Sequence, residues 1–484
     1  MKKYIILLSV CLLVTGCTES FLDKVPSNEI TKDEAITTLQ DVKVATDGLY
    51  ALMASTYYYN GSMFLYGDVK GDDMQATSWQ SGRTCYKYYM YEHSAAVPNS
   101  GGIWGRPYYI IRNAWNLIDA IDTGKITDAT IEELDDYKGQ ALAIIALCHF
   151  DLTRTYGYPY AKDRGASLGV PVVDHAIGFD EFPDRKTVAE CYDFIIRQLE
   201  SAVSMLSTDK NDGHFNRYAA QALLARVYLY CEENQKAFDC ADELIRELDA
   251  NRLYYLAGHD EYIAQFALNN KFGPEALFQI ANTASNNPGR DGISYLLHWW
   301  GYAAVVLTED FAGFMRQDPD DVRNQLIGSY LNGSDNLYYD VLLKYPGTDE
   351  ETPSFENNYT VIRLSEVYLI AAEAGLKVGG MARSAGLGYL NAIVQRANPD
   401  KLVSDNEYTL DRVLDERRKE LVGEGHRYFD MLRNGKTIYR SGGKHLLSTP
   451  SEVNWDYFKC VLPIDRTQFT FNPDMEQNPG YTRD

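Results

Sequence analysis

The segment Tyr218–Leu248 decides the fold of this chain, and it reads YAAQALLARVYLYCEENQKAFDCADELIREL. It predicts two helices, the first over about Tyr218–Cys231. Small Ala225 is followed by Tyr228 three residues later and by Ala237 twelve residues later, a spacing typical of a tetratricopeptide-like hairpin. Small side chains at these positions let two antiparallel helices approach closely. The second helix carries one apolar face: Ala237, Cys240, Ala241, Leu244, Ile245 and Leu248.

A further helix is predicted before this hairpin, over Val188–Leu206. Its apolar residues recur at intervals of three and four, which places them on one face. Thr187 precedes it as a capping residue, and Glu190 completes a capping box. Weaker versions of the pattern occur at Tyr137–Tyr156 and Val361–Ala397. The sequence therefore predicts an all-α fold of degenerate helical hairpins rather than a uniform repeat.

Two long stretches, about residues 56–105 and 254–353, lack a clear helical pattern. Both are rich in aromatic residues and glycine. Long loops in a compact protein are usually functional or disordered, and so many aromatic side chains argue against disorder. We interpret both stretches as irregular insertions on a helical scaffold whose repeats lie mainly at residues 108–250 and 360–440.

The N-terminus has the pattern of an export signal. Two lysines precede the apolar stretch Tyr4–Val14, which is too short to span a bilayer that needs ~20 residues. The residues Leu-Val-Thr-Gly then precede Cys17, as in the signal of a bacterial lipoprotein. We predict a lipoprotein signal peptide over residues 1–16, lipidation of Cys17, a tether over residues 17–32 and a single domain over residues 33–484.

Composition and charge exclude several classes of protein. The chain has 68 acidic and 46 basic residues among 484, a formal charge of −22. Nucleic-acid binding rests mainly on Lys and Arg, so no nucleic-acid partner is expected. No zincin motif, P-loop or complete EF-hand loop occurs, and no cofactor or metal site is predicted. The cysteines after Cys17 form no CxxC pair and are widely spread, so few or no disulfides are expected.

The first insertion contains a candidate ligand-binding loop, Asp72–Arg83. Trp79 is flanked there by amides, hydroxyls and the Arg83 guanidinium, so the indole does not belong to an apolar stripe. Trp79 and Arg83 are therefore candidates for a binding surface. Tyr86 is a further candidate, although the tyrosines from 86 to 91 would also fit a half-buried strand.

The second insertion contains another candidate loop, Tyr295–Tyr302. Trp299 and Trp300 are adjacent, and two neighbouring side chains cannot face the same way in a helix or strand. At least one indole is therefore expected at the surface or in the mouth of a pocket. Tyr295, Trp299 and Trp300 complete the candidate ligand-binding set.

Enzyme and metal motifs have simpler explanations. Gly165–Gly169 matches the G-x-S-x-G pattern of a hydrolase, but that motif needs a strand before it and a helix after it. A polar loop precedes it here, and Pro171 opposes a helix, so we interpret the match as chance. Asp318, Asp320 and Asp321 could bind Ca²⁺, but such clusters more often mark a helix start. No catalytic residue is predicted.

Five further segments complete a family resemblance that begins with Cys17. The segments are Lys138–Pro171 (KGQALAIIALCHFDLTRTYGYPY…LGVP), Arg185–Glu190 (RKTVAE), Ile362–Gly375 (IRLSEVYLIAAEAG), Glu416–Gly435 (ERRKELVGEGHRYFDMLRNG), and Leu462–Ile464 (LPI) with Asn478–Tyr481 (NPGY). Together they resemble the SusD/RagB family of bacterial outer-membrane nutrient-uptake lipoproteins, and they occur in that family's order.

The resemblance implies a SusD-like, all-α fold with tetratricopeptide-type hairpins and long aromatic, loop-rich insertions. It also implies a surface lipoprotein in the outer membrane, anchored by lipid and facing the exterior, with a SusC-like TonB-dependent barrel as its partner. Since the resemblance covers the charged segment 412–420, we expect that segment to form a structural network with Glu424, Arg427 and Asp430 rather than a binding patch.

The favoured hypothesis is therefore a protein that binds oligosaccharide or polysaccharide without cleaving it and passes it to the barrel. Aromatic platforms surrounded by polar side chains suit neutral sugars. One alternative is a peptide- or protein-binding uptake lipoprotein of the same architecture. A less favoured alternative is a lipid-anchored glycan hydrolase. It stays open because the separation of two catalytic carboxylates is a property of the folded protein and not of the sequence.

Overall fold

A computed structural model describes residues 35–96, 101–178, 180–267, 271–347, 356–440, 445–446 and 449–484. The predicted signal peptide at residues 1–16, the lipidation site Cys17 and the tether at residues 17–32 lie outside the described residues.

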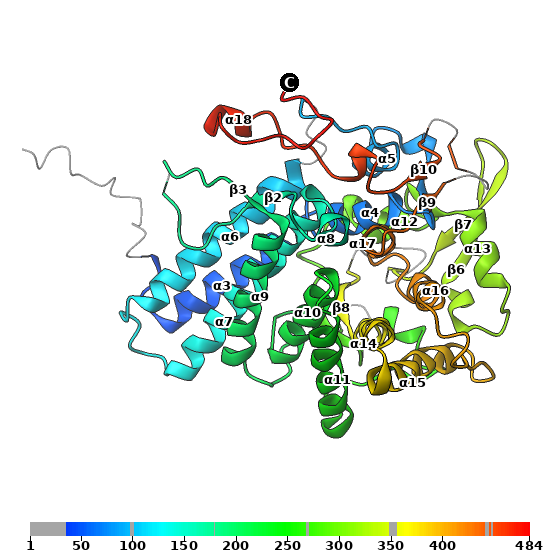
Figure 1. Ribbon diagram of the computed structural model, residues 1–484, viewed down its shortest axis with the longest axis horizontal. Helices are drawn as coiled ribbons and strands as arrows, with labels where there is room; N and C mark the ends of the chain where they lie inside the picture. Colours follow the sequence, from blue (N-terminus) through cyan, green and yellow to red (C-terminus); the bar gives the residue numbers. More distant parts are fainter. Residues whose placement is uncertain are drawn as a thin grey trace, which may run out of the picture.

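Long helices form the scaffold, and each one packs on the next along a single array (Figure 1). The array starts at one end of the molecule and ends beside the strands at the other end. Its helices are α3 (Leu39–Met53), α6 (Gly101–Asp122), α7 (Ile131–Tyr156), α9 (Val188–Met205), α10 (Arg217–Tyr230), α11 (Asn234–Asn251), α14 (Leu364–Val378) and α15 (Gly380–Ala397).

The short helices lie mostly in the insertions and in the last third of the chain. They are α4 (Ser62–Val69), α5 (Thr84–Tyr89), α8 (Tyr160–Asp163), α12 (Ile293–Leu297), α13 (Glu309–Arg316), α16 (Leu410–Glu420), α17 (Arg427–Arg433) and α18 (Gln468–Phe471).

Ten short strands are found among the described residues, and each pairs with one antiparallel partner. The pairs are β1 (Met74–Ala76) with β5 (Val305–Leu307), β2 (Leu168–Pro171) with β3 (Arg185–Thr187), β4 (Ala276–Ile280) with β8 (Tyr359–Arg363), β6 (Ile327–Asn332) with β7 (Leu337–Leu342), and β9 (Ile438–Tyr439) with β10 (Glu452–Val453).

Local sequence signals set the helices of the scaffold as predicted. The side chain of Thr187 accepts from the Glu190 backbone and the Glu190 side chain accepts from the Thr187 backbone, so the capping box of α9 is confirmed. Helix α10 carries four fully buried alanines, and α11 packs on it after a turn of three residues. The predicted all-α, helix-rich character is confirmed, with only short strands added.

The first insertion is more helical than its sequence predicts. All eight residues of α4 are buried, so this helix has no polar face and leaves no amphipathic pattern in the sequence. The alternative of a half-buried strand at the tyrosines from 86 to 91 is wrong, because Thr84–Tyr89 forms α5 and buries Tyr88 and Tyr89. Helix α6 begins at Gly101, seven residues before the predicted start of the repeats at residue 108.

Candidate functional site: an aromatic surface on the paired insertions

The two insertions meet through the pairing of β1 with β5. Met74 lies opposite Leu307 and Ala76 opposite Val305. The contact continues beyond the strands, because the Thr77 amide donates to the Ala304 carbonyl at 2.9 Å. The two candidate loops, far apart in sequence, are therefore adjacent in space.

Trp79 joins the first loop directly to the second. Its indole Nε1 donates to the carbonyl oxygen of Tyr302 at 3.2 Å. The half-buried ring lies edge-on to Tyr339 of β7, with centroids 5.1 Å apart. Trp79 and Trp299 also pack against a small apolar cluster that is separate from the main core: Ala303, Val306 and Val341. The edge of the indole is thus fixed, while part of the side chain stays accessible.

Arg83 covers a neighbouring ring. Its guanidinium carbon lies 3.9 Å from the centroid of Tyr302, a cation–π geometry. Nε donates to Gln80 Oε1 at 2.7 Å, and Nη1 lies 3.1 Å from Asp291 Oδ1. These contacts come from both insertions and hold the guanidinium flat against the aromatic side chain.

The second loop is a tight turn whose aromatic rings contact one another. The Tyr302 amide donates to the Tyr295 carbonyl at 2.9 Å. A Cβ on Gly301 would meet that same carbonyl oxygen at 2.1 Å, so the turn requires glycine there. Tyr295 lies edge-on to Tyr302 at 4.6 Å and to Trp300 at 5.4 Å.

A buried histidine supports both tryptophans. The ring of His298 lies 4.8 Å from that of Trp299 and 4.6 Å from that of Trp300. Burial lowers the pKa of His298 to about 4, so the imidazole is neutral at physiological pH. Trp299 itself packs on β6, where a Cβ on Gly328 would meet its ring at 3.1 Å.

The structure brings five of the six candidate ligand-binding residues together. Tyr86 lies on α5 one turn after Arg83, where its amide donates to the Arg83 carbonyl at 3.1 Å and its ring packs against the main core. The sequence analysis missed Tyr339, since its role depends on the β6–β7 hairpin, which the loop-rich pattern did not reveal. We call the following seven half-buried residues the aromatic surface: Trp79, Arg83, Tyr295, Trp299, Trp300, Tyr302 and Tyr339.

A separate apolar groove lies on the opposite part of the scaffold, between α6, the loop before β3 and α18. It encloses about 420 Å³. Phe182 and Phe471 stack nearly parallel at 6.3 Å on its rim and, like Tyr109, are about half exposed or more. No candidate residue falls in this groove, and no pattern in the sequence indicates that Phe182 and Phe471 are in contact.

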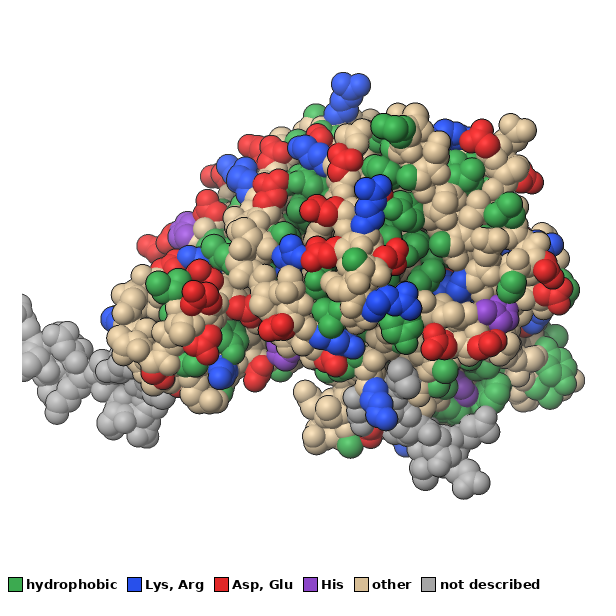
Figure 2. All heavy atoms as spheres, turned by 90° about the horizontal axis from the view of Figure 1, so that it is seen from below, with side chains coloured by type: hydrophobic (Ala, Val, Ile, Leu, Met, Phe, Trp, Pro, Cys, Tyr) green, Lys and Arg blue, Asp and Glu red, His purple; other side chains and the backbone are tan. Residues whose placement is uncertain are grey.

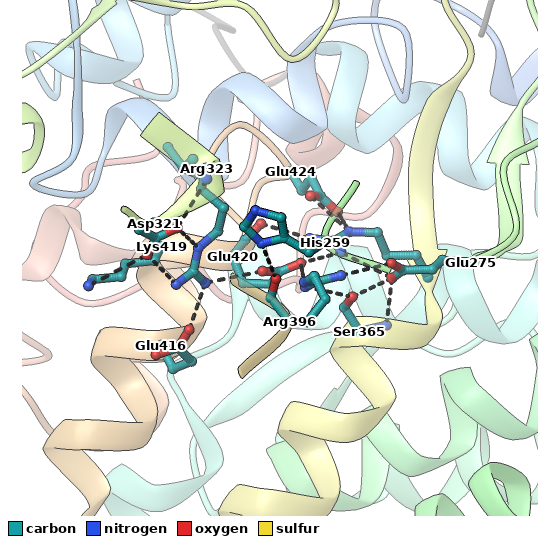
Figure 3. Close-up of polar contacts among 12 residues, drawn as sticks. His259, Glu275, Asp321, Arg323, Ser365, Arg396, Glu416, Lys419, Glu420 and Glu424 are labelled. Carbon is teal, nitrogen blue, oxygen red and sulfur yellow. Dashed lines mark hydrogen bonds and ion pairs between the residues drawn. The ribbon is translucent and has the colours of Figure 1, made fainter. Parts of the chain in front are cut away.

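The charged segment on α16 forms the interior network that we expected (Figure 3). Glu420 Oε1 lies 2.6 Å from Arg363 Nη1 and 2.7 Å from Arg396 Nη2, while Oε2 lies 3.1 Å from Arg323 Nη1. Burial acts to raise the pKa of Glu420, but the three guanidinium groups hold it well below its usual range. The carboxylate therefore stays ionised inside the protein.

The other expected members do not all belong to this network. Glu424 joins it by contacting Arg363 and Lys344, whereas Arg417 and Asp430 form a separate buried pair at 2.7 Å. Almost all of these side chains are buried and already paired. Glu416, Arg417 and Glu420 are therefore buried structural residues, as expected. The expectation of one network is wrong for Arg418 and Arg427, which pair with residues of the first insertion.

The hydrolase-like motif has the wrong geometry for a nucleophile elbow. Gly165 follows the short helix α8, and Ser167 leads into strand β2 instead of a helix. Asp321 caps a short helix and pairs with Arg323 at 2.7 Å, and Asp318 accepts from Asn398. Among the described residues, no group of three or more His, Cys, Asp or Glu side chains could hold a metal ion.

The outer surface carries charges of both signs. Figure 2 shows acidic and basic side chains interspersed over one face, with apolar side chains between them. The described part of the chain contains no helix that is both long and apolar enough to cross a membrane. Its six cysteines, from Cys85 to Cys460, are free thiols.

Comparison with known proteins gives the family. Residues 331–481 match the SusD family, and residues 20–229 match a family described as "Starch-binding associating with outer membrane". A crystal structure of a SusD superfamily protein from Bacteroides vulgatus is 53% identical, covers 92% of this chain and all of that chain, and superposes with a TM-score of 0.90.

Two other solved structures share the fold. A putative sugar-binding protein from Bacteroides vulgatus is 39% identical over 93% of this chain and all of its own, with a TM-score of 0.84. Surface glycan-binding protein A from Bacteroides thetaiotaomicron, solved with laminarihexaose, is 20% identical over 91% of this chain and all of its own, with a TM-score of 0.73. On its sequence motifs, its helical scaffold and these matches, the chain belongs to the SusD family.

Proposed function

We propose that this protein binds an oligosaccharide or polysaccharide on the aromatic surface and does not cleave it. The observation that carries the proposal is the convergence of two insertions on one set of half-buried rings. Sugar rings have weakly apolar faces that pack on aromatic side chains, and their hydroxyl groups need polar neighbours. Gln80, Arg83 and Asp291 supply such neighbours beside Trp79 and Tyr302.

Relatives of the family support a sugar ligand. The 39% identical structure carries the description of a putative sugar-binding protein, and the protein solved with laminarihexaose has the same fold. The ionisable groups found beside the rings are held by each other, as in the Arg83–Asp291 pair. A ligand without formal charge would leave these pairs intact.

The cellular setting is part of the same proposal. Lipidation at Cys17 would hold the protein at the outer membrane, on the exterior face, and a SusC-like TonB-dependent barrel would receive the ligand. Support comes from the lipoprotein signal in the sequence and from the family description that names the outer membrane.

A peptide ligand is the second candidate, and the apolar groove is the observation that favours it. Its rim of Tyr109, Phe182 and Phe471 offers aromatic rings with few polar partners, which suits apolar side chains better than sugars. A peptide-binding protein would therefore use a different face from the aromatic surface.

Calorimetric titration separates these candidates. The chain from Thr18 onward is titrated with laminarihexaose, maltohexaose and a set of short apolar peptides, and the products are then checked by chromatography. Saturable binding of an intact sugar that Trp79→Ala weakens and Phe471→Ala leaves unchanged is expected. Peptide binding lost in Phe471→Ala would move the function to the groove, and released sugar fragments would refute the claim of binding without cleavage.

A further inference from the structure

Two acidic residues join the first insertion to the helices of the last third of the chain. Arg427 of α17 grips Asp72 with two contacts, Nε to Oδ1 at 2.7 Å and Nη2 to Oδ2 at 2.9 Å. Arg418 of α16 contacts Asp73 Oδ1 through its Nε. Each of the four side chains is at least 85% buried. We call these four residues the clamp.

The clamp lies directly at the start of β1, which begins at Met74. The main-chain oxygens of the acidic pair serve the other insertion, because Asp73 O accepts from the Thr308 amide at 2.9 Å and Asp72 O accepts from Thr308 Oγ1 at 3.0 Å. Thr308 directly follows β5. The same two residues therefore contact α16 and α17 with their side chains and the end of β5 with their backbone.

The backbone before the clamp is seated just as closely. The Gly425 amide donates to Asp68 Oδ2 at 3.1 Å, and a Cβ on Gly67 would meet the Gly425 carbonyl oxygen at 2.1 Å. A Cβ on Gly71 would meet Cγ of Arg427 at 3.1 Å. The segment from Gly67 to Asp73 thus fits against the α16–α17 turn with no space for larger residues, which limits how β1 can shift.

Among the residues that the structure describes, the Glu420 network does not contact β1 or β5. Glu420 of α16 pairs with Arg363 and Arg396 of the scaffold and with Arg323, which lies in the second insertion just before β6. The clamp instead joins the scaffold to the strand pair that carries Trp79 on one side and Tyr302 on the other.

We propose that Arg418 and Arg427 are positioning residues for ligand binding, because they fix the register and tilt of β1 and β5 and so set the distance between the two halves of the aromatic surface. This inference rests on the proposed function. When the rings of a binding surface are already in place, little conformational entropy is lost as the ligand binds. Without the clamp the rings must become ordered on binding, which lowers affinity although no ligand contact is removed.

The first test needs no ligand. Hydrogen–deuterium exchange by mass spectrometry is measured on the full chain in detergent for wild type, Asp72→Asn, Arg427→Lys and Arg427→Gln. Arg226→Gln is the control, since Arg226 of α10 forms a buried pair with Glu366 of α14. In the clamp variants, amides of residues 74–80 and 302–308 are expected to exchange at least tenfold faster, with α7 and α14 unchanged.

Arg427→Lys keeps the positive charge but loses the bidentate contact with Asp72, so an intermediate rate of amide exchange is expected. An intermediate rate would show that the geometry of the contact matters and not only its charge. It also keeps the test possible if Arg427→Gln does not fold. Uniform acceleration over the whole chain, or the same local opening in Arg226→Gln, would overturn the inference.

The second test measures affinity for whichever of laminarihexaose and maltohexaose the wild type binds. A loss of about tenfold in Asp72→Asn, with no loss in Arg226→Gln, is expected. Unchanged affinity despite local opening would overturn the positioning role. If the wild type binds neither sugar, the proposed function loses its support, while the exchange pattern still decides whether the clamp holds the two strands.

Discussion

The charged network around Glu420 and the aromatic surface around Trp79 differ in how completely their side chains are buried and paired within the protein. In the network, nearly every polar atom of Glu420, Arg363 and Arg396 has a partner inside the protein. In the aromatic surface, Trp79 bonds the main chain of Tyr302 through its edge and leaves part of its ring accessible. The polar atoms of the network are thus largely paired within the protein, whereas the aromatic surface keeps apolar area that is accessible to a ligand.

The difference shows that paired charges and half-buried rings serve different purposes here. Removing one partner from a buried ion pair leaves an unpaired charge in the interior, which costs stability. Removing a half-buried ring leaves the scaffold almost as it was and removes contact area at the surface. Stability and binding are therefore expected to be separable by mutation.

The largest effect is expected from Glu420→Ala. It leaves Arg323, Arg363 and Arg396 without their shared carboxylate and should lower the free energy of unfolding by about 3–5 kcal/mol. Chemical denaturation followed by circular dichroism measures this change. Exposed Glu452→Ala serves as the control and should stay within about 0.5 kcal/mol of wild type. A similar small change in Glu420→Ala would contradict the structural role of the network.

The next effect concerns pH and the interior of the scaffold. His149 lies within hydrogen-bonding distance of the Ile145 carbonyl through Nδ1, at 2.9 Å, and accepts from the Val173 amide through Nε2, at 3.2 Å. This geometry fits only a neutral ring that donates through Nδ1. Burial lowers the pKa of His149 to about 4.

Because the unfolded chain binds the proton more readily, the stabilisation by neutral His149 is present above pH ~6.5 and is lost as the pH falls towards about 4. The loss should reach the order of 3 kcal/mol from this residue. Denaturation midpoints measured between pH 7 and 4 test it, with His149→Gln expected to flatten the slope. An equal slope in that variant would assign the pH dependence to other groups.

A smaller effect on a different quantity is expected from Trp79→Ala. Affinity for the bound sugar should fall by about 2 kcal/mol, or roughly thirtyfold, because hot-spot aromatic side chains carry contributions of this size. Calorimetry measures the loss, and Phe471→Ala, which removes a more exposed ring from the groove, is the control. Equal affinity in the two variants would exclude Trp79 from the binding surface.

The smallest effect is expected from Arg83→Lys. Its ion pair with Asp291 is partly exposed, and such pairs contribute only about 0–1 kcal/mol to stability. Lysine cannot lie flat on Tyr302 as the guanidinium does, so affinity should fall by about 0.5–1 kcal/mol while the melting temperature barely changes. A large drop in melting temperature would show that Arg83 belongs with the network rather than with the surface.

Much of the scaffold could be predicted because its signals are local. Each signal is made by residues that are close together in the sequence. Examples are the capping box at Thr187, the apolar stripe over Val188–Leu206 and the hairpin after Tyr218. Helix α4 escaped prediction for a physical reason: a helix that is buried on every side has no polar face to reveal its period.

For the candidate site, the sequence indicated some of the residues but not the contacts that bring them together. Trp79 and Trp299 could be singled out because their neighbours are polar or aromatic, which is a local property. Their common cluster with Tyr339 depends on the pairing of β1 with β5 and on the β6–β7 hairpin. Tyr86 had the same local appearance, but its ring packs against the main core from α5.

The sequence by itself determined the helical scaffold, its caps and the two places where aromatic residues collect, since each follows from spacing along the chain. Its motifs carried the resemblance to the family. Only the tertiary structure decided which rings share a surface, which charges are buried against which partners, and that Asp72 and Asp73 tie β1 to α16 and α17. Those contacts join residues that are distant in sequence, and burial, not spacing, selects them.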